Sequence, residues 1–178
     1  MGTPKASANN TTSLKLSWSK VKDAKGYDVY QLKGNKWSKI KTANGTSYTV
    51  PKLKAGTSYK FYVKPYTKSG SKTVYGNKSK TLTTSTKSSA VSLKVTAGKK
   101  KASLSWKKAT GATNYVVYYK TSAKGKWVKL TTASSKTSSY TKTKLTSKKT
   151  YWFKVDTVRK ANGKTYTTTG STKSVKIK

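Results

Sequence analysis

Apolar residues fall on every second position in one short stretch near the start of the chain. Residues 13–19 read Ser-Leu-Lys-Leu-Ser-Trp-Ser, the pattern of a β-strand with one buried face. Alternation therefore predicts that Leu14, Leu16 and Trp18 face the interior. Residues 102–106, Ala-Ser-Leu-Ser-Trp, repeat the pattern. Both halves of the chain therefore contain the same kind of strand.

The same alternation predicts further strands, and no segment has helical periodicity over three turns. Turns such as Gly34-Asn35 and Lys124-Gly125 separate them. We expect seven short strands in each half, an all-β fold of two tandem, seven-stranded, immunoglobulin-like β-sandwiches. Beyond the first, the expected strands are residues 27–32, 36–42, 47–50 and 58–66, their counterparts 114–120, 126–131, 138–141 and 150–158, and the C-terminal end of each half.

The chain is one module used twice. The spacing of matched residues grows from 88 at Trp18 and Trp106 to 92 at Tyr59 and Tyr151, which two short loop insertions explain. A period this long, present in only two copies, is typical of tandem globular domains. We therefore predict one domain at residues 1–86 and a second at 87–178.

Three landmarks recur in order in both halves. They are Trp18 and Trp106 in the second strand, Tyr27 and Tyr115 in the third, and the runs from Leu53 to Tyr59 and from Leu145 to Tyr151.

With these landmarks the chain resembles the fibronectin type III family. The resemblance implies that the leucine of each run fills the core and that its tyrosine closes a tyrosine corner on upstream backbone. The second half departs from the pattern at Lys148, where the first half has Gly56. The family's integrin-binding Arg-Gly-Asp loop is absent, so that activity does not carry over. The abundance of Lys and Thr is also similar to modules in secreted or wall-attached proteins of Gram-positive bacteria.

Composition raises disorder as an alternative, because high net charge and low hydrophobicity are its signature. Hydrophobic residues make up 33% of the chain, yet five Trp and thirteen Tyr supply large side chains for a core. Their regular placement on strands favours folding. There is no Cys, and no run of 18 apolar residues occurs, so we expect neither disulfides nor a membrane-spanning segment. We interpret the sequence as a piece of a longer chain.

Catalysis lacks its usual residues. The sequence has no His, Cys or Glu, and its three acidic residues are Asp23, Asp28 and Asp156. We therefore predict no enzyme activity, no metal site and no cofactor. Asp23 is expected to cap a turn, and Asp28 and Asp156 to pair with Lys on neighbouring strands.

Net charge is the second main feature. There are 40 basic residues, all but one of them Lys, and the formal net charge is +37. Lysine is a point charge without the planar fork of arginine, which disfavours sequence-specific reading of nucleic acid. Counterion release would still give affinity for dense polyanions such as teichoic acid, glycosaminoglycan or extracellular DNA. The alternative is a solubilising surface that blocks association between strand edges.

One sheet face combines aromatic rings with lysines. If Phe61 and Val63 face the core, the residues between them face out and could stack on sugars or bases while lysines hold anionic groups. The alternative is that these rings only pack across strands beneath lysine stems. Trp37 and Trp127 are expected to pack at a sheet edge. The candidate binding residues are Tyr30, Lys60, Tyr62, Lys64 and Tyr66 in the first half and Tyr118, Trp152 and Lys154 in the second.

These observations lead to one functional hypothesis and two alternatives. The hypothesis is a non-catalytic, monomeric adhesion or accessory module, extracellular or on the bacterial surface. Its expected partners are anionic polymers, which it would bind without sequence specificity, and other domains of a longer chain. The alternatives are a mechanical spacer within a larger secreted or wall-attached protein and an engineered, supercharged scaffold.

Overall fold

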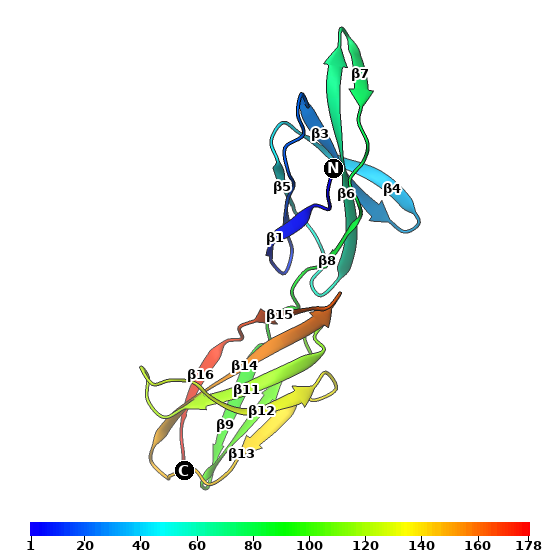
Figure 1. The fold of residues 1–178 in the computed structure, drawn as a ribbon. Helices are drawn as coiled ribbons and strands as arrows, with labels where there is room; N and C mark the ends of the chain where they lie inside the picture. Colours follow the sequence, from blue (N-terminus) through cyan, green and yellow to red (C-terminus); the bar gives the residue numbers. More distant parts are fainter. The chain divides into compact units, whose positions relative to one another are not determined.

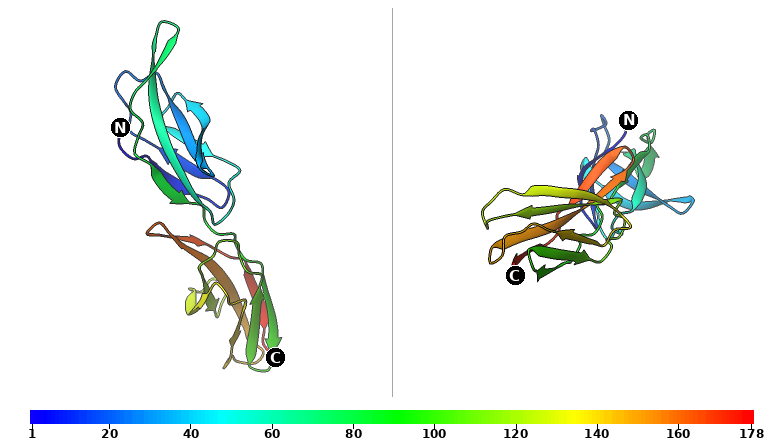
Figure 2. Two further views of the ribbon diagram at one scale, coloured as in Figure 1. Left: turned by 90° about the vertical axis from the view of Figure 1, so that its right-hand side faces the viewer. Right: turned by 90° about the horizontal axis from the view of Figure 1, so that it is seen from below.

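The computed structural model describes residues 1–7 and 9–178 in full and residue 8 through its backbone. The chain divides into two compact units, Met1–Thr86 (unit 1) and Lys87–Lys178 (unit 2) (Figures 1 and 2). Within the described residues every regular element is a β-strand and every pairing between strands is antiparallel. The all-β prediction is confirmed.

Unit 1 has two sheets. The smaller has the order β1-β2-β5, and the larger the order β4-β3-β6-β7 with β8 also paired to β6. The strands are β1 (Lys5–Asn9), β2 (Leu14–Ser17), β3 (Gly26–Lys33), β4 (Lys36–Ala43), β5 (Ser47–Val50), β6 (Ser58–Ser69), β7 (Lys72–Tyr75) and β8 (Leu82–Ser85).

Unit 2 repeats this arrangement. Its smaller sheet has the order β13-β10-β9, and its larger sheet the order β12-β11-β14-β15 with β16 also paired to β14. The strands are β9 (Leu93–Gly98), β10 (Lys101–Trp106), β11 (Asn114–Lys120), β12 (Val128–Ser134), β13 (Ser139–Lys142), β14 (Thr150–Ala161), β15 (Lys164–Thr168) and β16 (Thr172–Lys176).

The last strand of each unit is divided in two, so seven expected strands become eight segments. In unit 1 the division lies opposite Pro65, whose carbonyl accepts a hydrogen bond from Gly76 N at 3.0 Å. Proline has no N–H to return to the ladder, so regular pairing stops there. The chain stays attached through Ser79, whose hydroxyl accepts from Val63 N at 2.9 Å.

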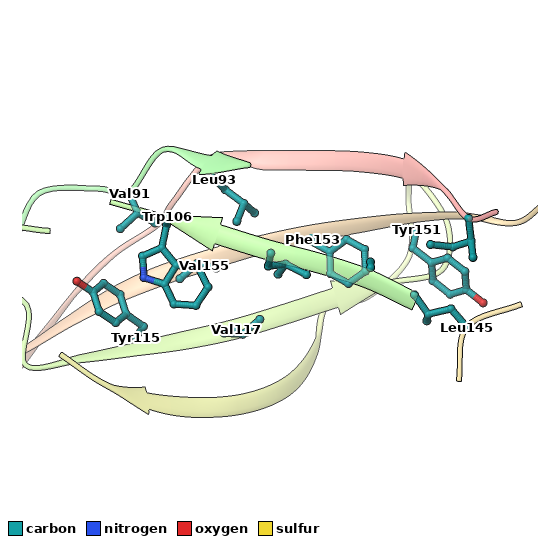
Figure 3. Close-up of a cluster of buried hydrophobic side chains, with 12 residues drawn as sticks. Val91, Leu93, Trp106, Tyr115, Val117, Leu145, Tyr151, Phe153 and Val155 are labelled. Atoms are coloured by element: carbon teal, nitrogen blue, oxygen red, sulfur yellow. The ribbon is translucent and has the colours of Figure 1, made fainter. Parts of the chain in front are cut away.

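The core of each unit lies between its two sheets. In unit 2, Trp106 and Tyr115 pack at one end and Leu145 and Tyr151 at the other, with Phe153 between (Figure 3). Of the residues expected in the cores, Trp18, Tyr27, Leu53, Trp106, Tyr115, Leu145 and Tyr151 are buried, and Tyr59 is partly buried against the core of unit 1.

Four tyrosine hydroxyls each accept a hydrogen bond from a backbone N–H five or six residues upstream. Tyr59 accepts from Lys54 N at 2.8 Å and Tyr151 from Thr146 N at 3.1 Å, the tyrosine corner that the family resemblance implies. Tyr27 and Tyr115 make a second such bond, at 2.8 Å, to the N–H of Val21 and Ala109. Each unit is thus fastened at both ends of its core.

A bulge interrupts the edge strand of each larger sheet. The pairing shifts by one residue between Val29 and Tyr30 on β3, and at the matching place on β11. The extra residues, Ile40 on β4 and Leu130 on β12, pack against the cores of their units. A bulge bends an edge strand and hinders pairing with another chain.

Lys148 occupies a left-handed conformation that suits glycine. Its φ is 62°, and Gly56 at the matching place in unit 1 has φ 59°. A non-glycine residue in the left-handed conformation costs about 1–2 kcal/mol of strain in the folded state. This strain exceeds the stability that glycine loses through its greater conformational entropy in the unfolded chain. We expect Lys148→Gly to stabilise unit 2 by roughly 0.5–1 kcal/mol and Gly56→Lys to destabilise unit 1 by a similar amount. Urea unfolding of both variants measures this, and opposite signs are required.

Removing the hydroxyl of Tyr115 leaves the Ala109 N–H without its acceptor in a well-packed site. We expect Tyr115→Phe to cost about 1–3 kcal/mol while the ring contact with Trp106 persists. Thermal unfolding with near-ultraviolet circular dichroism measures both effects. A variant as stable as the parent would show that the hydroxyl does not hold the loop.

Candidate functional site

The outward face of the larger sheet in unit 1 carries a row of aromatic rings. Tyr30 on β3 lies directly opposite Tyr62 on β6, and both face away from the core because Val29, Phe61 and Val63 face into it. The two rings stack with centroids 4.6 Å apart and an interplanar angle of 16°. Trp37 from β4 packs edge-on against Tyr62, also at 4.6 Å.

Lysine ammonium groups lie over these rings. Lys78 Nζ is 5.2 Å from the centroid of Tyr62, and Lys64 Nζ is 4.7 Å from that of Tyr75. Burial, and then the nearby Tyr30, raise the pKa of the Tyr62 phenol above its usual value of 10.0. The ring of Tyr62 is thus bordered by two other rings and an ammonium group, so a stacking ligand would have to displace one of them.

Beside the aromatic row lies a buried carboxylate. Asp28 is 1% exposed and accepts hydrogen bonds from Thr42 Oγ1 at 2.5 Å, Tyr75 Oη at 2.8 Å and Lys39 Nζ at 3.2 Å. Burial works against ionisation, but the three donors outweigh it, and the pKa of Asp28 lies below its usual value. The hydrogen bond that Tyr75 donates to Asp28 raises the pKa of the Tyr75 phenol above its usual value.

Unit 2 has a corresponding cluster built around Lys154. This residue lies opposite Tyr118 on the neighbouring strand, and its Nζ is 4.5 Å from the ring centroid of Tyr118 and 5.3 Å from that of Trp127. It also forms a 2.9 Å ion pair with Asp156, and its side chain is only 14% exposed. Lys154 is therefore enclosed by groups of its own unit.

The two buried carboxylates occupy one place in the fold but come from different strands. Asp28 on β3 lies opposite Lys64, and Asp156 on β14 lies opposite Val116. In the repeat, Asp28 corresponds to Val116 and Lys64 corresponds to Asp156. The same cross-strand pair therefore carries its acid on the first strand in unit 1 and on the second strand in unit 2. As expected, Asp28 bonds a lysine on the adjacent strand. The expectation was wrong for Asp156, whose lysine precedes it by two residues on β14.

The other predicted residues lie as follows. Lys64 and Tyr66 both contact the ring of Tyr75 and not the Tyr30–Tyr62 pair. The ring of Tyr66 also packs over Gly26: a Cβ added to Gly26 would lie 2.5 Å from the Tyr66 hydroxyl oxygen. Lys60 is exposed, opposite Thr83 on β8. Trp152 is half-buried opposite Lys120.

Sequence reasoning missed several members of this face. Trp37 and Trp127 were expected to pack at a sheet edge. Trp37 does so from the edge strand β4, against Tyr62, and Trp127 contacts Lys154 on the outward face. Nothing in the sequence analysis predicted Tyr75, Lys78 or Lys120. Their positions depend on the path of the divided last strand and on side-chain reach, for which alternation along one strand gives no signal.

Among residues 1–7 and 9–178, no three His, Cys, Asp or Glu side chains come together. No helix of the described chain is long and apolar enough to cross a membrane.

Comparison with known proteins identifies the first unit. Residues 2–83 match the family model of the fibronectin type III domain. Unit 1 is a fibronectin type III domain. The whole chain has the fold of a solved structure, the two fibronectin type III domain segment from chicken tenascin. The TM-score is 0.50 at 17% identity, with 93% of this chain and 95% of that one covered.

Two bacterial enzymes contain a stretch that is similar to part of this chain. Chitinase C of Streptomyces lividans is 44% identical and Chitinase 63 of Streptomyces plicatus 43% identical, each over 63 residues. The match covers 35% of this chain and 10% of each chitinase. The chain therefore spans about a tenth of the length of these curated relatives.

The Asp28 cluster gives unit 1 a defined pH dependence. Because the folded pKa of Asp28 is lowered, its contribution is complete above the usual value of 3.8 and is lost as pH falls through the folded pKa. We expect Asp28→Asn to cost roughly 1–3 kcal/mol at pH 7, with the difference from the parent shrinking below about pH 4. Urea unfolding with amide exchange of β3 measures this.

The control for this experiment is Asp23→Asn, because Asp23 is exposed in a loop. It should leave stability unchanged across the same pH range. A constant penalty for Asp28→Asn down to pH 2 would contradict the assignment of an ionised Asp28. At the alkaline end, the raised pKa of Tyr75 means that its bond is kept below pH 10 and lost as pH rises through the folded value.

Proposed function

We propose that this chain is a non-catalytic accessory module of an extracellular bacterial protein and that it binds polyanionic surfaces through its overall charge. The proposed ligands are wall polymers, glycosaminoglycans and non-specific nucleic acid. It would bind them in proportion to their charge density, without sequence choice.

The observation that carries this proposal is the sign of the exposed charge. Of three acidic side chains, Asp28 and Asp156 are buried and bonded to lysines of their own units, which leaves only Asp23 exposed. Against it stand 40 basic residues. A surface of nearly one sign attracts a polyanion over the whole molecule, and the gain comes from the counterions released.

The arrangement of the lysines favours diffuse binding over a single pocket. Lys154, the lysine at the centre of the aromatic cluster of unit 2, already forms an ion pair with Asp156 and lies over two aromatic rings. The rings of Tyr30 and Tyr62 are stacked on each other. These contacts favour a packing role for the aromatic face, with exposed lysines such as Lys60 supplying the attraction. Direct ligand contact by the eight candidate residues stays a prediction.

An accessory role is supported by the proteins in which similar sequences occur. The stretch shared with the two Streptomyces chitinases is a tenth of each enzyme, which suits a module beside another domain. A spacer is the second candidate. It is favoured by the short connection between the units. Thr86 is hydrogen-bonded to Thr57 of unit 1 and Ser88 to Thr157 of unit 2, so a single residue, Lys87, separates the two bonded positions along the chain.

Retention on immobilised heparin over a salt series tests polyanion binding. We expect retention at about 0.15 M salt, with the logarithm of the binding constant falling linearly against that of the salt concentration. Lys60→Gln and a matched change at the exposed Lys99 of unit 2 should each lower the slope by no more than about one. DNA of equal charge density should behave as heparin does.

Three outcomes would count against this proposal. Passage through the column unretained at about 0.15 M salt would favour the spacer. Strong selectivity between heparin and DNA at equal charge density, or loss of binding on Lys60→Gln but not on Lys99→Gln, would indicate a localised site.

A further inference from the structure

Unit 1 has an apolar groove between the loop that follows β2 and the β6–β7 hairpin. It has a volume of about 200 Å³ and is lined by residues 21–24 of the loop, 65–67 of β6 and 74–76 at the end of the hairpin. Val74 and Tyr75 are 49% and 41% exposed there. In Figure 1 the β6–β7 hairpin extends past the neighbouring strands of its unit.

The same place in unit 2 can be located from the strand registers. Tyr66 pairs with Tyr75 in unit 1, and Val158 pairs with Thr167 in unit 2. The groove-lining segments therefore correspond to residues 109–112, 157–159 and 166–168.

In unit 2 this place is occupied by the chain segment that leads into β9. Ser89 exchanges two bonds with Thr110: its amide donates to the Thr110 carbonyl at 3.3 Å, and its hydroxyl accepts from Thr110 N at 3.0 Å. Ser88 is fully buried. Its hydroxyl donates to Thr157 at 2.9 Å, and its carbonyl accepts from Thr168 Oγ1 at 2.8 Å.

The register of the first strands shows what corresponds to this segment in unit 1. Lys5 pairs with Ser17 as Lys94 pairs with Ser105, so Lys5 and Lys94 are equivalent. Counting back, Met1 matches Ala90, and Ser88 and Ser89 match the two positions that would stand immediately before Met1.

We propose that the groove of unit 1 is the seat of a segment of chain that runs into β1 from the N-terminal side. The residue equivalent to Ser89 would pair with the backbone of Lys22, which takes the place of Thr110. The residue equivalent to Ser88 would carry an apolar side chain, because Pro65 takes the place of Thr157, the partner of the Ser88 hydroxyl. Gly76, in the place of Thr168, has no hydroxyl to donate to the backbone carbonyl of that residue. In a tandem array this segment is the linker from a preceding domain.

The experiment adds three residues, Lys-Leu-Ser, directly before Met1 of the full chain. Seating of this extension should slow hydrogen exchange of the Lys22 amide at least tenfold and shift the methyl resonances of Val74 in NMR spectra. An extension of Gly-Gly-Gly should give less than a third of that protection. Unchanged exchange at Lys22 with the Lys-Leu-Ser extension would overturn the proposal.

Matched variants separate seating in the groove from a general effect. Val74→Lys in the extended chain should remove the protection, whereas Val128→Lys, at a residue of unit 2 that is likewise 50% exposed, should leave it intact. Equal protection by Gly-Gly-Gly would refute the apolar preference. Protection that rises with protein concentration would show that a second copy, not the chain's own extension, fills the groove. None of these outcomes depends on polyanion binding.

Discussion

Each unit depends on buried tyrosines whose rings fill the core and whose hydroxyls hold upstream backbone. Tyr27 and Tyr115 pack against the tryptophans of the facing sheet at 5.7 and 5.5 Å between ring centroids, and each accepts a backbone N–H from the loop after that tryptophan. A hydroxyl buried without a partner would cost more than its bond contributes. The packing of each tyrosine ring and the conformation of the loop whose N–H it accepts are therefore coupled.

The charge of the chain makes this coupling necessary. A formal net charge of +37 acts against any compact state through self-repulsion, so apolar packing has to hold each unit together. The few carboxylates are placed where they act locally. Asp28 joins β3, β4 and the end of β7 through three donors, and Asp156 accepts from Lys154 and from the amide of Gly170 after β15. In both units one acid ties the last strand to the larger sheet.

This placement also shapes what the surface offers to other molecules. The two acids are withdrawn from solvent, which leaves the exposed lysines almost without opposite charge. The outward aromatic rings contact one another, and lysine ammonium groups lie over them. In the function we propose, such a surface would attract anions broadly, whereas the apolar groove of unit 1 is the proposed seat of a chain segment.

Alternation, the repeat and the three landmarks were sufficient to predict the fold, because a half-buried strand leaves a period-two pattern that only one sheet face can satisfy. The outward placement of Tyr30 beside Tyr62 followed from the same rule. The tertiary structure alone decided the rest. Pro65 stops the ladder only because its missing N–H would point at the last strand, and Asp156 selects Lys154 because β14 carries both. Trp37 reaches Tyr62 across the sheet. These contacts depend on side-chain direction and on distances between strands remote in sequence, which no pattern along a single strand contains.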